Sequence, residues 1–260
     1  MEYIIIAVVS LAASSLGTIC GIGGGVVVKP VLDALGMMSV ESVSFLSGVT
    51  VLCMSAYSVL VDAWKGGARM QGQTVSLSIG AAAGGVAGKL LFNMAARLAP
   101  NVEMVGALQT ACLFVLSLGT FFYTIFKARI TTHQVKSMGV CLTVGGLLGV
   151  LSAFLGIGGG PFNLVFLSFF FSMQSKTAAK SSLFIILCSQ MTSLLLTLAR
   201  NTVPPFDPAM LVMMALMGIL GGTIGRSINK RIDTQVVDKL FLFMTLLILG
   251  ICVYNFLRFV

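Results

Sequence analysis

The sequence predicts an all-α polytopic membrane protein that consists of two inverted repeats, each with five helical segments. Composition gives the first reason, because 57% of the 260 residues are hydrophobic and 9% are charged, whereas soluble domains carry about 25% charged residues. The second reason is the pentapeptide Gly-Ile-Gly-Gly-Gly at 21–25, which returns unchanged at 156–160. The third is the distribution of Lys and Arg along the chain. Several apolar runs of about 17 residues or more favour helices over a barrel as the spanning form.

About ten helical segments are expected, five before and five after a polar linker at 127–136. The apolar segments lie at 3–20, 26–38, 42–61, 74–91 and 103–126, and then at 138–155, 161–173, 181–199, 209–225 and 240–257. Segments 26–38 and 161–173 are each about 20 Å long as helices, which is less than the roughly 30 Å hydrocarbon core. We therefore expect two short helices that begin or end at mid-depth in the membrane.

The two halves match beyond the glycine motif. Cys53 and Ser58 return 135 residues later as Cys188 and Ser193, and the motif Gly-Gly-x-x-Gly followed by a basic residue occurs at 84–89 and 221–226. Matches that keep their order with a nearly constant offset indicate an internal duplication. The predicted halves are 1–130 and 131–260, which together form one membrane domain.

The basic residues predict the orientation of the halves. If each glycine motif is the tip of a hairpin that returns to its own side, and the N-terminus is external, eleven basic residues lie inside and four outside. The inner set is Lys65, Arg69, Lys127, Arg129, Lys136, Lys176, Lys180, Arg226, Lys230, Arg231 and Lys239. The outer set is Lys89, Arg97, Arg200 and Arg258. If each hairpin counts as one crossing, the two sides become nearly equal. The positive-inside rule favours the first arrangement, which is inverted and has both termini external.

Several other kinds of site are not expected. The net charge of +8 is explained by membrane topology and does not indicate nucleic-acid binding. The acidic start of the chain, without Lys or Arg, indicates a membrane segment and not a cleaved signal peptide. Six cysteines without a Cys-x-x-Cys motif read as small buried side chains. The only histidine, His133, lies in the polar linker, so no metal site and no cofactor is predicted.

The two glycine motifs are the candidate binding site. Glycine-rich sequence cannot stay helical, and a broken backbone in hydrocarbon is tolerated where it is buried or lines a cavity. A short helix follows each motif, and free N–H groups at a helix start attract anions. Tight turns that serve only packing are the alternative. The candidate glycines, expected to meet near mid-membrane, are Gly21, Gly23, Gly24 and Gly25 with Gly156, Gly158, Gly159 and Gly160.

Polar side chains near the motifs are further candidates. Lys29 lies on the first short helix with Asp33 four residues on, so it either adds charge to the site or forms a neutral pair with Asp33. Hydroxyls and amides that could donate to an anion are Ser47, Asn163, Ser181, Ser182 and Gln190. Helix capping is the alternative for serines at these helix starts, and interhelical hydrogen bonding is the alternative for Gln190.

Small residues at helical spacing indicate close helix packing. Gly80, Gly84 and Gly88 recur every fourth residue, and Gly218, Gly222 and Gly225 have a similar spacing of four and three residues. Such residues let membrane helices approach closely, so packing is favoured over a direct role in binding. Lys89 and Arg226 follow these glycines and are expected to anchor the helix ends at the membrane surface.

The paired glycine motifs, the duplication and the length resemble the sulfite exporter family TauE/SafE over nearly the whole chain. The most specific parts are 21–25 and 156–161, followed by Ala-Lys-Ser-Ser at 179–182. The small-Gly-Thr-Ser start that the family has in the next helix is only approximate here, because Lys180 replaces the glycine. The resemblance implies a secondary transporter, an exporter of sulfite, sulfonates or related organosulfur anions by alternating access. It also implies the inner (cell) membrane of a bacterium.

The alternatives to this function belong to other classes of membrane protein. An anion channel, or a carrier for other small anions such as carboxylates, would also use symmetric glycine breaks. A structural membrane protein without transport would bind no anion. An enzyme is not expected, because the apolar segments contain no histidine and few carboxylates. The expected partners are a small anionic substrate, the lipid bilayer and a coupling ion, either proton or sodium. A homo-oligomer is left open.

Overall fold

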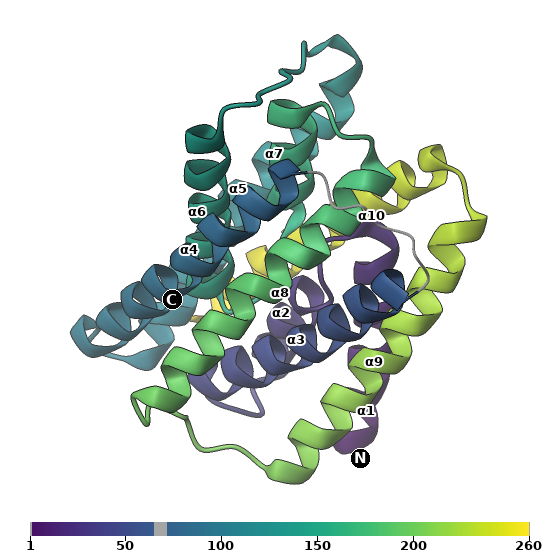
Figure 1. The fold of residues 1–260 in the computed structure, drawn as a ribbon. Helices are drawn as coiled ribbons and strands as arrows, with labels where there is room; N and C mark the ends of the chain where they lie inside the picture. Colours follow the sequence, from purple (N-terminus) through teal and green to yellow (C-terminus); the bar gives the residue numbers. More distant parts are fainter. Residues whose placement is uncertain (1, 65–71, 260) are drawn as a thin grey trace.

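The computed structural model describes residues 2–64 and 72–259, and these residues form ten α-helices and one 3₁₀ turn without a β-strand (Figure 1). The first half contains α1 (Glu2–Cys20), α2 (Gly25–Leu35), α3 (Val40–Trp64), α4 (Gly72–Leu98) and α5 (Val102–Phe126). The turn η1 (Lys127–Arg129) is followed by α6 (Met138–Leu155), α7 (Pro161–Phe171), α8 (Ser175–Ala199), α9 (Pro208–Arg231) and α10 (Thr234–Phe259). The predicted all-α polytopic fold is confirmed.

Eight of the described helices are long and apolar enough to cross a membrane, and α2 and α7 are not among them. Each of these two has 11 residues, or about 16 Å of helix. They are shorter than the expected 26–38 and 161–173, because Gly36 and Ser172 end them with φ of 64° and 51°. Several long helices exceed their predicted apolar segments, because polar residues continue the helix beyond the apolar run. For example, α8 begins at Ser175 and not at residue 181.

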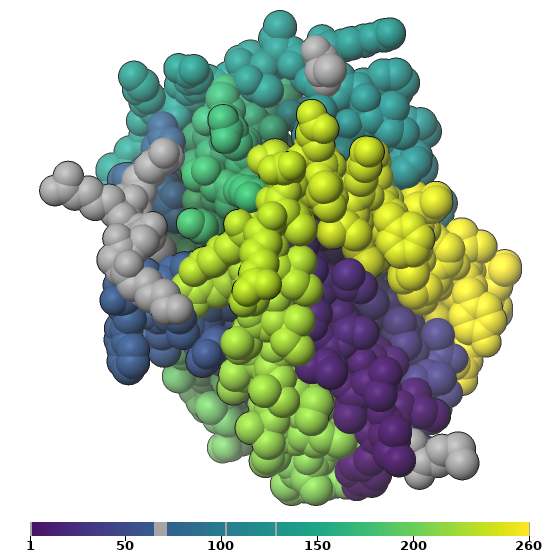
Figure 2. Space-filling view, turned by 90° about the vertical axis from the view of Figure 1, so that its right-hand side faces the viewer, coloured from purple at the N-terminus to yellow at the C-terminus, as the bar shows by residue number. Residues whose placement is uncertain are grey.

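Glycines bring long helices from the two halves into close contact. A methyl group added at Gly84 of α4 would lie 2.1 Å from the carbonyl oxygen of Gly146 in α6. The matching pair is α9 with α1, where a methyl group at Gly225 would lie 2.2 Å from the carbonyl oxygen of Ser15. These approaches agree with the predicted packing role of the glycines. Figure 2 shows the purple N-terminal helix lying against the yellow-green and yellow C-terminal helices.

Polar contacts between helix ends and connecting segments form two separate groups. In one group, Tyr3 at the start of α1 donates a hydrogen bond to Asp207 in the α8–α9 connection. Ser42 in the first turn of α3 donates to the Pro205 carbonyl of the same connection (2.7 Å). Asp207 also accepts from the amide of Ala209 at the start of α9. The Tyr3 hydroxyl and then this amide hold the pKa of Asp207 below its usual range, because both favour the carboxylate.

The second group surrounds the linker between the halves. Lys127 pairs with Asp238, and Ser175 at the start of α8 donates to the same carboxylate (2.7 Å). The Gln73 amide at the start of α4 donates to the carbonyl of Val135 (3.0 Å). The linker, the α7–α8 connection and the α9–α10 connection are thus neighbours. Lys65 and Arg69, which the charge argument placed on the same side, lie outside the described residues.

Candidate functional site

The first glycine loop (21–25) reverses the chain between α1 and α2. Gly21 and Gly23 have φ of 72° and 78°, values that side-chain-bearing residues rarely adopt. The amide of Ile22 donates back to the Gly17 carbonyl (2.9 Å), which closes the end of α1. The amides of Val27 and Val28 donate to Gly24, which begins α2. The glycines are therefore needed for the turn itself.

The second glycine loop (156–160) reverses the chain in the same way between α6 and α7. Gly156 and Gly158 have φ of 64° and 71°. Pro161 occupies the first turn of α7, where its missing N–H leaves no hydrogen bond unmade. The backbone N–H of Asn163 donates a hydrogen bond to the Gly160 carbonyl within that turn (3.1 Å).

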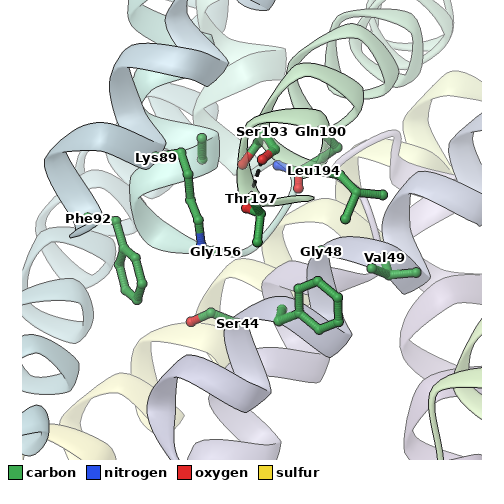
Figure 3. Close-up of a pocket in the computed structure, with 12 residues that line it drawn as sticks. Ser44, Gly48, Val49, Lys89, Phe92, Gly156, Gln190, Ser193, Leu194 and Thr197 are labelled. Carbon is green, nitrogen blue, oxygen red and sulfur yellow. Dashed lines mark hydrogen bonds between the residues drawn. The ribbon is translucent and has the colours of Figure 1, made fainter. Parts of the chain in front are cut away.

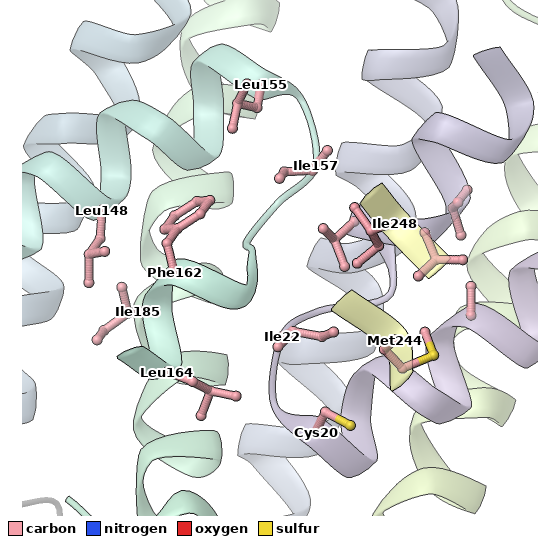
Figure 4. Close-up of a cluster of buried hydrophobic side chains, with 14 of the residues drawn as sticks. Cys20, Ile22, Leu148, Leu155, Ile157, Phe162, Leu164, Ile185, Met244 and Ile248 are labelled. Atoms are coloured by element: carbon pink, nitrogen blue, oxygen red, sulfur yellow. The ribbon is translucent and has the colours of Figure 1, made fainter. Parts of the chain in front are cut away.

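The two loops contact each other. A methyl group added at Gly25 would lie 2.2 Å from the carbonyl oxygen of Ile157, and one at Gly159 would lie 3.0 Å from that of Ile22. The Ile22 and Ile157 side chains are buried, and Figure 4 shows them on the two facing loops. Glycine is required here because a backbone occupies the space of the missing side chain.

Each loop also packs on the long helix that follows the other loop. A methyl group at Gly21 would lie 2.2 Å from Ala179 of α8, and one at Gly156 would lie 2.7 Å from Ser44 of α3. Ala179 and Ser44 are 135 residues apart, as are Gly156 and Gly21. The contacts of the first loop are thus repeated by the second.

Both short helices begin without a side-chain cap, so no side chain takes up the N–H groups of their first turns. Two buried hydroxyls, of Ser14 and Ser47, have no hydrogen-bond partner among the described residues. They would lie 2.8 Å from methyl groups added at Gly24 and Gly25 respectively. N–H groups and hydroxyls around a helix start form a donor set suited to a small anion.

The second short helix carries a related pair. The side-chain amide of Asn163 donates to the hydroxyl of Ser182 (3.2 Å), and the Asn163 side-chain oxygen has no partner within 2–64 and 72–259. Ser47 and Ser182, equivalent by the repeat, thus both lie close to the glycine loops or their short helices. The structure brings Asn163, Ser47 and Ser182 together with the glycines.

Three other candidate side chains have hydrogen-bond or ion-pair partners of their own. The Lys29 ammonium lies 2.7 Å from Asp33, one turn further from the loop, and both side chains are at most 4% exposed. The Ser181 hydroxyl lies 3.2 Å from that of Thr74 on α4. The Gln190 amide donates to Ser152 on α6 (3.2 Å) and lies beside the second loop, in the pocket described next.

Two pockets flank the loops. The Lys89 pocket lies beside the second loop, between α3, α4, α6 and α8, and is lined by residues that include Ser44, Lys89, Gly156, Gln190 and Thr197 (Figure 3). The Arg226 pocket lies between α1, α3, α8 and α9, and is lined by residues that include Thr18, Asp62, Lys180 and Arg226. Each holds about 30 Å³ of free volume, room for roughly one water molecule. Lys89 and Arg226 therefore line pockets beside the candidate site, a position that the anchor interpretation did not anticipate.

Sequence reasoning missed Ser14 and Lys89 as neighbours of the loops. Ser14 and Ser15 are adjacent hydroxyl residues in an otherwise apolar segment, which was the available signal. Lys89 lies far from both motifs in the sequence, and only the packing of α4 on α6 and α8 brings it to Gly156.

Comparison with known proteins agrees with this architecture. The model of the family described as sulfite exporter TauE/SafE matches residues 6–251. The probable membrane transporter protein YunE of Bacillus subtilis (strain 168) is 24% identical over 271 residues, which cover 95% of this chain and 96% of that protein. No solved structure matches the chain significantly. Since the family match extends over nearly the whole chain, the protein belongs to the sulfite exporter TauE/SafE family of membrane transporters.

Proposed function

We propose that the protein is a secondary transporter that exports small sulfur-containing anions by alternating access, and that it is not an enzyme. The observation that carries the proposal is the contact between two equivalent glycine loops, each followed by a short helix without a side-chain cap. Helix starts attract anions through their free N–H groups and their partial positive charge. Two such starts in one place provide an anion site without a dedicated arginine cluster.

The substrate site in this proposal consists of the two glycine loops with Ser47, Asn163 and Ser182. Ser47 keeps a buried hydroxyl without a partner in the described part of the chain. Asn163 would contact an anion through its side-chain NH2 group, which now donates to Ser182, because its unpartnered amide oxygen can only accept hydrogen bonds. Gln190 belongs to the approach on the side of the second loop. Ser181 and Lys29 have partners of their own, so their contribution requires a different side-chain position during transport.

The halves 1–130 and 131–260 are proposed to be inverted in the membrane. Supporting this, the start of α1 belongs to the group of contacts around Asp207, whereas the start of α6 follows the linker group around Asp238. The distribution of basic residues indicates that the linker faces the cytoplasm and that both termini are external. For a bacterial protein of this family the membrane is the inner membrane.

Alternating access is supported by the paired pockets. The Lys89 and Arg226 pockets are lined by equivalent helices of opposite halves. In this conformation each pocket has only about 30 Å³ of free volume, so both are closed, and Ile22 and Ile157 fill the contact between the loops. Opening one pocket while the other stays closed would expose the loops to one side at a time.

The substrate class follows from the family, and the experiment must therefore test it directly. Purified protein in liposomes that contain radiolabelled sulfite should release it with saturable kinetics. Unlabelled sulfite outside should accelerate the release, because a carrier returns loaded faster than empty, whereas a channel shows no such exchange. Methanesulfonate and acetate as competitors would separate sulfur oxyanions from carboxylates. Absence of flux for every one of these anions contradicts the proposal.

The driving ion is proposed to be a proton or sodium. Efflux in vesicles with an imposed pH gradient, and separately with a sodium gradient, identifies it by the gradient that supports accumulation against concentration. Accumulation with neither gradient imposed would contradict secondary transport.

A further inference from the structure

The two pockets are equivalent by the repeat but differ in charge. Ser44, Lys89 and Thr197 of the Lys89 pocket correspond to Ala179, Arg226 and Asp62 of the Arg226 pocket, with offsets of 135 to 137 residues. A cation is thus kept at the same place in both pockets. Its neighbour is a carboxylate in one pocket and a hydroxyl in the other.

In the Arg226 pocket the cation already has an anionic partner. The Arg226 guanidinium donates to the Asp62 carboxylate, and the two side chains are 12% and 23% exposed. Such a charge-assisted contact occupies the guanidinium face that a free oxyanion would otherwise use. Asp62 therefore takes the position of a ligand in this pocket.

In the Lys89 pocket no side chain takes that position. Lys89 forms no ion pair with any carboxylate in the described ranges, and Glu41 at the start of α3 lies beyond ion-pair distance. Its ammonium lies 4.8 Å from the centre of the Phe92 ring. Figure 3 shows the Lys89 side chain extending into the pocket, between Phe92 on one side and Ser193 and Thr197 on the other.

A second feature of this pocket points to a ligand. The Ser44 hydroxyl is buried, with the residue 7% exposed, and it has no hydrogen-bond partner among the described residues. It lines the same pocket as Lys89 and lies beside Gly156 of the second loop. A buried hydroxyl without a partner is costly unless a ligand or water supplies one.

We propose that Lys89 and Ser44 form a second anion subsite, in which the small oxyanion binds when the Lys89 pocket opens, before or after it occupies the glycine loops. On the proposed topology this subsite serves the external side, and the Asp62–Arg226 pair keeps the opposite pocket closed to anions in this conformation. The ligand is a compact oxyanion, because one cation and one hydroxyl in a narrow pocket suit a single charged group. This inference rests on the proposed function and adds an external subsite to it.

The test measures sulfite binding by titration calorimetry, with the full chain in nanodiscs of neutral phosphatidylcholine. Lys89→Gln should weaken binding about tenfold or more, since a charge-assisted contact is lost, and Lys89→Arg should retain most of the affinity. Thr197→Asp gives Lys89 the internal partner that Arg226 already has, and it should weaken binding to a similar degree. Arg97→Gln is the matched control, because it removes one positive charge from the last turn of the same helix outside the pocket.

The results separate this inference from the proposed function. Unchanged affinity in both Lys89→Gln and Thr197→Asp overturns the subsite. The same result is expected if Lys89 binds lipid phosphate and no sulfite. If Gly25→Ala abolishes sulfite flux in that case, the transport proposal still stands. If wild-type protein neither binds nor moves sulfite, both proposals fall.

Discussion

Gly25→Ala tests the contact between the two glycine loops. Gly25 is the first residue of α2 and has no positive φ, so alanine meets no backbone strain there. The added methyl group would instead lie 2.2 Å from the carbonyl oxygen of Ile157 and 2.7 Å from a methyl carbon of Val51. Ordinary contacts of this kind are 3.4 to 4 Å. The loops must therefore separate by more than about 1 Å, because the tightly packed interior has no free space for the methyl group.

The expected cost follows from this overlap. Forcing one extra methyl group into a packed interior costs about 1–3 kcal/mol, and the obstacle here is backbone, which yields less than a side chain. At roughly 2–4 °C per kcal/mol, the unfolding temperature should fall by about 2–12 °C. Sulfite efflux should fall more severely, because a displaced loop moves the N–H groups of both helix starts.

The matched control is Gly119→Ala on α5, where an added methyl group meets nothing within 4 Å. Alanine is the better helix former by up to about 1 kcal/mol, so this variant should be as stable as wild type or more so and transport normally. Both variants are compared in nanodiscs by thermal unfolding and in liposomes by efflux. A Gly25→Ala protein with wild-type stability and flux would refute the close contact of the loops.

Three further predictions concern the topology, the loops and the buried ion pair. A cysteine introduced as His133→Cys in a background without other cysteines should resist membrane-impermeant maleimide on intact cells and react after permeabilisation; labelling of intact cells would contradict a cytoplasmic linker. Gly24→Val should abolish efflux in protein that still inserts, since the backbone of Ser14 lies 2.7 Å from the added carbon. Gly159→Val should retain more activity, because its nearest neighbour is the side chain of Ile186 (2.4 Å) and the Ile22 carbonyl oxygen lies further away, at 3.0 Å; equal loss in both would argue against this difference. Lys29→Ala should destabilise the protein by about 3–5 kcal/mol by leaving Asp33 buried and unpaired, and Lys29→Met with Asp33→Leu should recover most of this loss. Sulfite affinity of the double variant then measures whether Lys29 also contributes charge to the site, with a loss of about tenfold expected if it does and no change if it serves only Asp33.

The membrane fold could be predicted from the sequence because its determinants are local. A helix in hydrocarbon satisfies its own backbone, so an apolar run of sufficient length is enough to predict a span. The short helices α2 and α7 were predicted for the same reason, since glycine and proline act within one or two turns. Helix ends were predicted less well, because polar residues that lengthen α3 and α8 carry no hydrophobic signal.

The same distinction between local and long-range determinants applies to the candidate site. The sequence by itself determined the two glycine turns, the uncapped helix starts and the repeat that relates them, since each depends on residues adjacent in the chain. Only the tertiary structure decided that the loops touch through Gly25 and Ile157 and that Lys89 reaches the second loop. The position of Lys89 depends on the packing of α4 against α6 and α8. Such packing results from the combined fit of many side chains at long separation, and no local pattern of residues encodes it.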